Sequence, residues 1–246
     1  MQMTTQDTVR SLGTILCVFA HPDDETFTMG GLLAMACANG QKVVVLTATK
    51  GEGGVRDAVR WPAETLGATR AAELKTALAE LGEIEQEFLD YLDGSCASSD
   101  KESAAIQIAE RIRQVRPDSI FTFGPDGMTG HSDHQAVSAW ATRAHGLAGS
   151  TAKLFHATLI PEQYEDFRAA DAQFNFFFNT EMPPVCNEPE TAVCLRLEDI
   201  WYERKLAALH AMPSQYEELL SHFTGDELRG GFGIEAFTEA TDARAT

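Results

Sequence analysis

Runs of apolar residues alternate with amphipathic stretches along the first 150 positions of the chain. Four runs have the length and the Val, Ile and Phe content of strands: "TILCVFA" (14–20), "QKVVVLTAT" (41–49), "EQEFLDYLDG" (85–94) and "DSIFTFG" (118–124). Three stretches between them have a helical pattern and end at a glycine or before a proline: 28–39, 66–81 and 104–115. This alternation predicts an α/β fold with a mainly parallel, doubly wound sheet.

The last third of the chain is less regular. We expect two further strands, a loop-rich insertion, a helix and a frayed polar end: "AKLFHATLI" (152–160), "TAVCLRLE" (191–198), "FFFNTEMPPVCNEPE" (176–190), "DIWYERKLAALHAM" (199–212) and "TEATDARAT" (238–246). Neither a long linker nor an internal repeat interrupts the pattern. The sequence therefore predicts a single domain over residues 1–246 with a modified C-terminal third.

Composition and charge limit the partners of the protein. The 246 residues include 19 Lys and Arg against 37 Asp and Glu, a net charge of −18, which argues against an extended nucleic-acid footprint or an anionic membrane surface as a partner. The five cysteines form no CxxC pair, and Cys17 and Cys37 fall on apolar positions, so we expect a reduced, cytoplasmic protein. The N-terminus lacks an apolar core of signal-peptide length, and no stretch approaches a membrane span. Oligomeric state cannot be inferred from these features.

Candidate chemistry begins directly after the first predicted strand, at "HPDDE" (21–25). Ligand sites of open α/β sheets lie beyond the carboxyl ends of the strands. One acid there could favour the start of the next helix, with Thr26 or Asp24 as its N-cap. Three acids beside a histidine exceed what a cap requires, so the segment is a candidate functional site, in which Glu25 supports the loop.

A second cluster follows the fourth predicted strand, in "GPDGMTGHSDHQAV" (124–137). Because parallel strands point their carboxyl ends the same way, we expect the two clusters to converge. His21 and Asp24 are three positions apart, as are His131 and His134, and such residues project to one side of a helical turn. A catalytic metal needs about three protein ligands with one position left open, and one histidine, one carboxylate and a distant histidine form such a set.

These residues carry a resemblance to a known family. "AHPDDE" and "GHSDH" resemble the motifs of the PIG-L/LmbE-like metal-dependent N-acetylglucosaminyl deacetylases, which include enzymes of bacillithiol and mycothiol biosynthesis. Ser132 replaces the proline of the usual second motif. Further similarities are "TATKGEGG", the pair Arg70 and Glu73, "FLDYLDG" and "KLAALHAMPSQ", although the last departs from the usual His-x-Ser-Gln ending and leaves no clear role for His210. The resemblance spans about residues 13–215.

The resemblance implies a Rossmann-like fold and a division of labour among the site residues. It implies that His21, Asp24 and His134 bind the metal, with zinc as the expected ion and Fe(II) as an alternative. Asp23 would be the general base. His131 would stabilise the oxyanion or donate a proton, with Asp133 orienting it. The implied reaction removes an acetyl group from an N-acetylglucosamine-type sugar or its conjugate, so the expected partner is a small amide.

Other residues are weaker candidates. Arg56, Arg60 and Arg70 could hold a hydroxylated or anionic substrate, but Arg56 and Arg60 could equally be solvated. Asp93 could hydrogen-bond sugar hydroxyls or simply form an Asx turn. Glu52 could face the site or stabilise its own glycine-rich loop. The aromatic run at 174–178 is typical of a core or an interface.

Several alternative functions remain open from the sequence. An amidase for another small N-acyl amine or thiol conjugate would use the same chemistry, and an inactive relative would keep the same residues. A nucleotide-sugar binding module would need a glycine-rich fingerprint after the first strand, where this chain has "HPDDE". A non-haem iron oxygenase also uses two histidines and one carboxylate, but it leaves Asp23 without a task.

Overall fold

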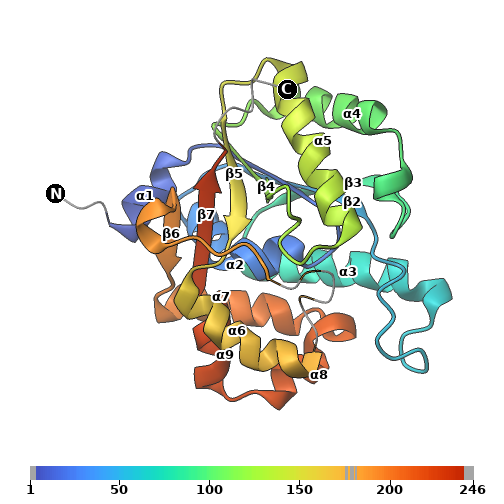
Figure 1. The fold of residues 1–246 in the computed structure, drawn as a ribbon, viewed down its shortest axis with the longest axis vertical. Helices are drawn as coiled ribbons and strands as arrows, with labels where there is room; N and C mark the ends of the chain where they lie inside the picture. The colour runs from blue at the N-terminus through green and yellow to red at the C-terminus, as the bar shows by residue number, and fades with distance from the viewer. Residues whose placement is uncertain (1–3, 175–176, 178–179, 181, 241–246) are drawn as a thin grey trace.

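The computed structural model describes residues 4–174, 177, 180 and 182–240. In these residues a sheet of seven strands in the order β3-β2-β1-β4-β5-β7-β6 is surrounded by helices (Figure 1). The strands are β1 Ile15–Phe19, β2 Val43–Thr49, β3 Glu85–Tyr91, β4 Ser119–Phe123, β5 Lys153–Thr158, β6 Val193–Arg196 and β7 Ile234–Glu239. The helices are α1 Thr5–Ser11, α2 Asp24–Ala38, α3 Ala63–Leu81, η1 Cys96–Ser98, α4 Lys101–Val115, α5 Ser132–Ala148, α6 Pro161–Phe174, η2 Glu188–Glu190, α7 Asp199–His210, α8 Pro213–His222 and α9 Gly225–Phe232.

The central strands are apolar because helices cover both faces of the sheet. Every residue of β1, β2 and β4 is buried. Helices α4 and α5 pack together on one face, while α2, α3 and α7 pack on the other (Figure 1). Parallel strands covered in this way carry continuous apolar runs rather than an alternating pattern. The prediction of a mainly parallel, doubly wound α/β sheet is confirmed.

The topology places a switch point between β1 and β4. From β1 the chain winds outward through β2 to β3, and it then returns to add β4 on the other side of β1, followed by β5. Ile15 of β1 therefore pairs in parallel with both Val43 and Ser119. Ligand sites of doubly wound sheets lie outside the carboxyl ends of the strands at such a point. The segments after β1 and β4 are the two that carry "HPDDE" and "GHSDH".

The C-terminal third departs furthest from the sequence prediction. The strands β5 and β6 and the helix α7 were expected, but α6, α8, α9 and β7 were not. Strand β7 lies between β5 and β6 and is antiparallel to both, so Thr238 and Glu239 are in the sheet rather than frayed. Helices α6 and α8 lie beyond the carboxyl end of β5 (Figure 1). Residues 241–246 of the expected frayed end lie outside the described residues.

Three helices begin earlier than their sequence patterns indicated. Helix α2 begins at Asp24 rather than at Thr28, and its N-cap position is Asp23, whose side chain makes no capping hydrogen bond. The expectation of Thr26 or Asp24 as N-cap is therefore wrong. Helix α3 begins at Ala63, and α4 begins at Lys101 after Asp100, whose side chain accepts from the first turn. Polar first turns carry no apolar period, which hides them from a pattern-based prediction.

A buried ion pair joins the C-terminal third to α2. The helix is interrupted at Met29, where φ is −148° and ψ is 22°. The Glu235 carboxylate accepts from the backbone N–H groups of Gly31 (2.8 Å) and Leu32 (2.7 Å), and Lys205 Nζ lies 2.8 Å from the same carboxylate. Glu235 thus caps the second segment of α2 from outside the helix.

None of the helices in the described part of the chain is both long enough and apolar enough to cross a membrane. The single-domain organisation and the cytoplasmic location stay predictions.

Candidate metal centre

The two predicted clusters meet at the carboxyl edge of the sheet. Nδ1 of His21 lies 3.1 Å from Nε2 of His134. The Asp24 carboxylate completes a triangle, with oxygens 3.6 Å from His21 Nδ1 and 3.5 Å from His134 Nε2. His21 and His134 are buried, and the side chain of Asp24 is 12% exposed. The expected convergence of residues more than 100 positions apart therefore occurs.

The spacing of these three donors fits a divalent ion. Ligands about 2.0–2.1 Å from a tetrahedral ion lie about 3.3 Å apart, close to the observed 3.1–3.6 Å. Among the described residues, His21, His131 and His134 also form a possible metal group, as do His21, Asp93 and Asp133. The Asp133 carboxylate is less suited to a metal, because its two oxygens already accept from the backbone N–H groups of Gly94 (2.7 Å) and Cys96 (3.0 Å).

Hydrogen bonds on the far side of each ring direct one nitrogen of each histidine toward the triangle. His134 Nδ1 lies 3.0 Å from the carbonyl oxygen of Gly127, so Nδ1–H donates there and Nε2 keeps its lone pair. His21 Nε2 lies 3.0 Å from Asp93 Oδ1 and 3.4 Å from Asp133 Oδ2, which leaves Nδ1 as the acceptor. Carbonyl or carboxylate partners of this kind are typical of metal-binding histidines.

The same carboxylates make His21 a strong base. Burial lowers the pKa of His21, but hydrogen bonds to Asp133 and Asp93 and the charge of Asp24 outweigh burial and raise it to about 10. A proton and a metal ion therefore compete for the same imidazole.

Asp23 has a strained backbone and a buried partner. Its φ of 127° is in a region that non-glycine residues rarely adopt and that costs on the order of 1–3 kcal/mol. Its Oδ2 accepts from Arg70 Nη2 at 3.1 Å, and Arg70 also donates to the carbonyl oxygens of Pro22 (2.8 Å) and Gly51 (2.9 Å). Burial raises the pKa of Asp23 to about 6, and the Arg70 charge opposes that rise. Asp23 is thus an ionisable carboxylate close to neutral pH.

The glycine at position 51 is required for this arrangement. Its φ is +65°, and a Cβ built there would lie 2.3 Å from the Arg70 guanidinium. Only glycine tolerates both conditions without displacing the arginine. The loop "GEGG" is therefore shaped around Arg70, which makes Arg70 a partner of Asp23 and of the backbone.

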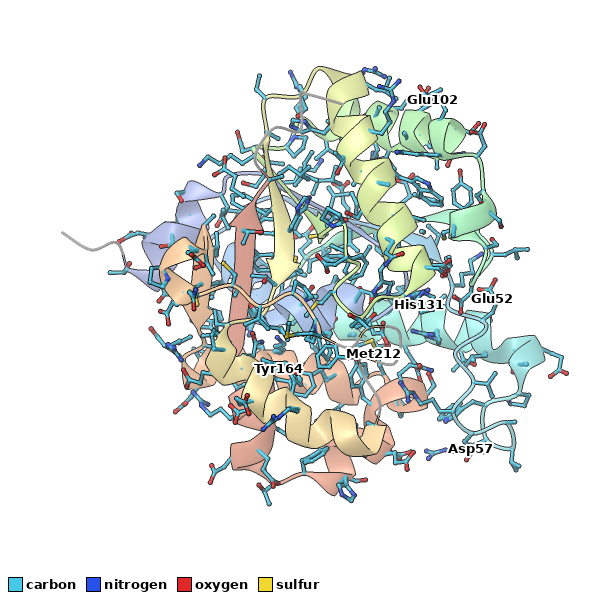
Figure 2. All side chains as sticks on the ribbon, in the orientation of Figure 1. Glu52, Asp57, Glu102, His131, Tyr164 and Met212 are labelled. Atoms are coloured by element: carbon cyan, nitrogen blue, oxygen red, sulfur yellow. The ribbon has the colours of Figure 1, made fainter. Side chains whose placement is uncertain are left out.

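His131 lies at the N-cap of α5, at the end of the helix nearest the C-terminal helices (Figure 2). Its Nδ1 accepts from the backbone N–H of Asp133 at 3.1 Å, so in the neutral ring Nε2 carries the hydrogen. Burial and the charge of His21 lower the pKa of His131, which favours this neutral form. His131 is therefore placed to donate a hydrogen bond from Nε2.

Asp133 is fully buried, and its side chain contacts the turn after β3 and His21. The contact with His131 described above is made by the backbone of Asp133. Orientation of His131 by the Asp133 carboxylate stays a prediction.

A cavity of about 420 Å³ opens onto these residues. One side, here called the sheet-edge wall, carries the charged residues at the strand ends: His21, Asp23, Asp24, Asp93, His131 and His134. Another side, here called the helical wall, comes from α6 and α8: Phe174, Gln215, Tyr216, Glu218 and Leu219. Gln215 joins the two sides, because its Nε2 donates to the carbonyl oxygen of Gly54 at 3.0 Å.

The weaker candidates divide into two groups. Arg56, Arg70 and Asp93 line the cavity, and Arg56 is exposed there. Arg60 instead pairs with Glu217 and lies over the Trp61 ring. His210 is exposed, and it is not among the residues that line this cavity.

Two of the acidic residues support the loops around the site. Glu52 Oε1 accepts from the backbone N–H of Asp93 at 3.1 Å rather than from its own loop. Glu25 is fully buried and accepts from Thr26 Oγ1 (2.6 Å) and from the backbone N–H of Asp23 (3.3 Å), consistent with support of the loop.

Sequence reasoning missed the helical wall. Phe177 is buried as expected for the aromatic run, but Phe174 lines the cavity, and residues 176 and 178 lie outside the described residues. Tyr216 and Leu219 were not singled out, although their spacing of three is that of one helix face. The Ser-Gln pair at the end of "KLAALHAMPSQ" could have indicated this wall, since Ser214 and Gln215 are in the first turn of α8.

The fold and the donor set define a class of protein: a doubly wound α/β protein with a candidate divalent-metal centre at the switch point of its sheet. Within that class, the chain matches the PIG-L family, described as GlcNAc-PI de-N-acetylase, over residues 16–145. The match covers more than half of the chain, and the protein belongs to this family. The matched segment contains both motif clusters but ends before α6 and α8.

Among curated relatives, a 1D-myo-inositol 2-acetamido-2-deoxy-alpha-D-glucopyranoside deacetylase from Rhodococcus jostii is 37% identical over 158 residues. The alignment covers 55% of this chain and 54% of the relative. The matched segments span 50–66% of the length of the first four curated relatives.

Solved structures share the fold at low sequence identity. The N,N'-diacetylchitobiose deacetylase of Pyrococcus horikoshii has a TM-score of 0.65 at 20% identity, covering 97% of this chain and 87% of that one. The 4-carboxy-2-hydroxymuconate hydratase of Pseudomonas putida has a TM-score of 0.60 at 17% identity, covering 93% and 96%. Because deacetylases and a hydratase share this fold, function has to be argued from the site.

Proposed function

We propose that the protein is a metal-dependent hydrolase that removes the acetyl group from the amide nitrogen of an N-acetylglucosamine-type amino sugar or its conjugate. The observation that carries the proposal is the triangle of His21 Nδ1, Asp24 and His134 Nε2 at one cavity with Asp23 and His131. The relative from Rhodococcus jostii, whose name describes an acetamido-sugar deacetylase, supports the substrate class.

In this proposal His21, Asp24 and His134 hold one divalent ion, with zinc expected and Fe(II) as the alternative, since both accept nitrogen and carboxylate ligands. When bound, such an ion lowers the pKa of a water molecule to about 7 and polarises a carbonyl group. The remaining steps are the work of the side chains around it.

Asp23 is the proposed general base. Its carboxylate lines the cavity beside Asp24, and a pKa of about 6 leaves it mostly ionised at pH 7, yet basic enough to take a proton. Arg70 holds Oδ2 at 3.1 Å, so the second oxygen is available for the proton of the attacking water. The proton can then pass to the nitrogen of the leaving amine.

His131 is the proposed donor to the developing oxyanion. Because Nδ1 of His131 accepts from the backbone N–H of Asp133 at 3.1 Å, the neutral ring carries its hydrogen on Nε2, and the residue lines the cavity. A preorganised donor of this kind costs no reorganisation when charge develops on the acyl oxygen.

The amine portion of the substrate is proposed to extend along the helical wall. Arg56 is exposed at the cavity and suits a hydroxylated or anionic substituent, while Phe174 and Leu219 offer apolar contact. The expected partner is a small-molecule amide.

The test is hydrolysis by the metal-loaded protein, with release of free amine and acetate measured together. N-acetylglucosamine derivatives should be cleaved faster than acetylated lysine peptides. A reversed preference would exclude the sugar and keep the amidase chemistry. Oxygen uptake that depends on a cosubstrate, without acetate release, would instead favour an iron oxygenase.

A further inference from the structure

Asp93 is held by three polar contacts from different parts of the chain. Its Oδ1 lies 3.0 Å from His21 Nε2, its Oδ2 accepts from the backbone N–H of Gly53 at 2.8 Å, and its own N–H donates to Glu52 Oε1 at 3.1 Å. The side chain is 10% exposed. Each carboxylate oxygen therefore already has a protein partner.

Of the two carboxylates at His21, Asp93 is the closer. Asp133 Oδ2 lies 3.4 Å from the ring nitrogen and also accepts from Gly94, whereas Asp93 Oδ1 lies at 3.0 Å. The Nε2–H of His21 therefore points to Asp93, which fixes the ring rotation and keeps the Nδ1 lone pair toward Asp24 and His134. A carboxylate in this place also increases the basicity of the imidazole.

We propose that Asp93 is a positioning residue for the metal ligand His21. Through Asp93, the loop after β2 (Glu52 and Gly53) and the end of β3 together set the orientation of a ligand that follows β1. The inference rests on the metal site of the proposed function, but not on the identity of the substrate.

The first readout is metal affinity, measured by competition with a chelator on the full-length protein with Zn²⁺ or Co²⁺. Asp93→Asn keeps the size and one acceptor but removes the charge, and Asp93→Ala removes both. Loss of a carboxylate behind a metal-binding histidine weakens metal affinity by about 10- to 100-fold. We expect the alanine variant at the upper end of this range and the asparagine variant at the lower end.

The second readout separates positioning from substrate binding. A positioning role alone predicts that, at saturating metal, Asp93→Asn changes KM for an N-acetylglucosamine derivative by less than about twofold. Asp90→Asn is the matched control, because Asp90 is in β3, three residues before Asp93, is 70% exposed and pairs with Lys50. It should leave metal affinity and KM unchanged.

Unchanged metal affinity together with a raised KM would overturn the inference and make Asp93 a sugar-binding residue. Circular dichroism and thermal unfolding of the metal-free variants check the fold, and Asp93→Glu, which restores the carboxylate, should recover metal affinity in part. If the wild type binds metal but cleaves no amide, a fall in affinity still supports Asp93 while the proposed function fails. If the metal content changed in neither the His134 nor the Asp93 variants, the inference about Asp93 and the proposed function would both be overturned.

Discussion

The two walls of the cavity are built in different ways. The sheet-edge wall comes from the ends of parallel strands, and its side chains are fixed from behind by backbone groups and carboxylates, as for His134 at Gly127 and His21 at Asp93. The helical wall comes from α6 and α8, and it contributes apolar and aromatic side chains, such as Phe174 and Leu219, beside the polar Gln215 and Glu218. The family match at residues 16–145 covers the first wall and not the second.

This difference suggests a division between chemistry and selectivity. Groups that hold a metal or move a proton need fixed directions, which the ends of packed strands and their hydrogen bonds provide. A wall that recognises the amine portion of a substrate needs shape and apolar area, which helices added at the C-terminus can supply. Substitutions on the two walls should therefore have effects of different kind and size.

The largest effect is expected from loss of a ligand on the sheet-edge wall. His134→Ala should remove the bound metal and reduce hydrolysis to background, because two donors bind a divalent ion poorly in a site built for three. Elemental analysis of the dialysed protein measures metal per chain. His210→Ala, an exposed histidine, is the control and should keep full metal and activity. Full metal content in His134→Ala would disprove the ligand set.

The adjacent acids Asp23 and Asp24 should give opposite defects. Asp23→Asn should keep the metal and lose about 10²- to 10⁴-fold in kcat, the usual contribution of a proton-transfer group. Asp24→Asn should instead weaken metal binding, since a neutral amide is a poorer ligand than a carboxylate. Metal analysis beside kcat for both variants makes the distinction. Equal loss of metal would make both acids ligands, and near-normal kcat for Asp23→Asn would move the base elsewhere, with Asp133 the next candidate.

His131 should affect only the transition state. His131→Ala should lower kcat and kcat/KM together by about 10²- to 10³-fold, as for the loss of one oxyanion donor, with metal retained and little change in KM. Steady-state kinetics at saturating metal provide the measurement. A raised KM with normal kcat would instead assign His131 to substrate binding.

A smaller effect is expected on the helical wall. Phe174→Ala should raise KM by about tenfold, equivalent to ~1.4 kcal/mol of binding, with kcat and metal unchanged. Ile200→Ala, an exposed apolar residue of α7, is the control. If Phe174→Ala lowered kcat as strongly as His131→Ala, the division between the two walls would fail.

The smallest effect on activity is expected at the buried ion pair of Lys205 and Glu235, although its loss should strongly reduce stability. Lys205→Met leaves the buried Glu235 carboxylate without its counter-charge and should cost about 3–5 kcal/mol of unfolding free energy. Urea denaturation measures this loss. Arg143→Met, at the exposed pair with Glu102, should change stability little. Metal binding by the folded Lys205→Met protein should stay normal.

Particular elements show why the sequence predicted some parts of the protein and missed others. The strand Ile15–Phe19 could be recognised because a strand buried on both faces must be apolar at every position. Strand β7, with Glu235 inside it, could not be recognised, because that glutamate is satisfied by Lys205 and by two N–H groups of α2. Likewise α6 and α8 have polar sequences with few apolar residues. The role of those residues as cavity lining becomes visible only in the folded structure.

The sequence by itself determined the alternation of strands and helices and the residue types of the two clusters, because apolar runs and the i, i+3 spacing are local properties of the chain. The tertiary structure decided which nitrogen of each histidine faces the triangle with Asp24, that Arg70 holds Asp23, and that Asp93 contacts His21. Those choices depend on partners from other strands and loops, such as Gly127 and Glu52, whose distances arise only when the sheet has formed.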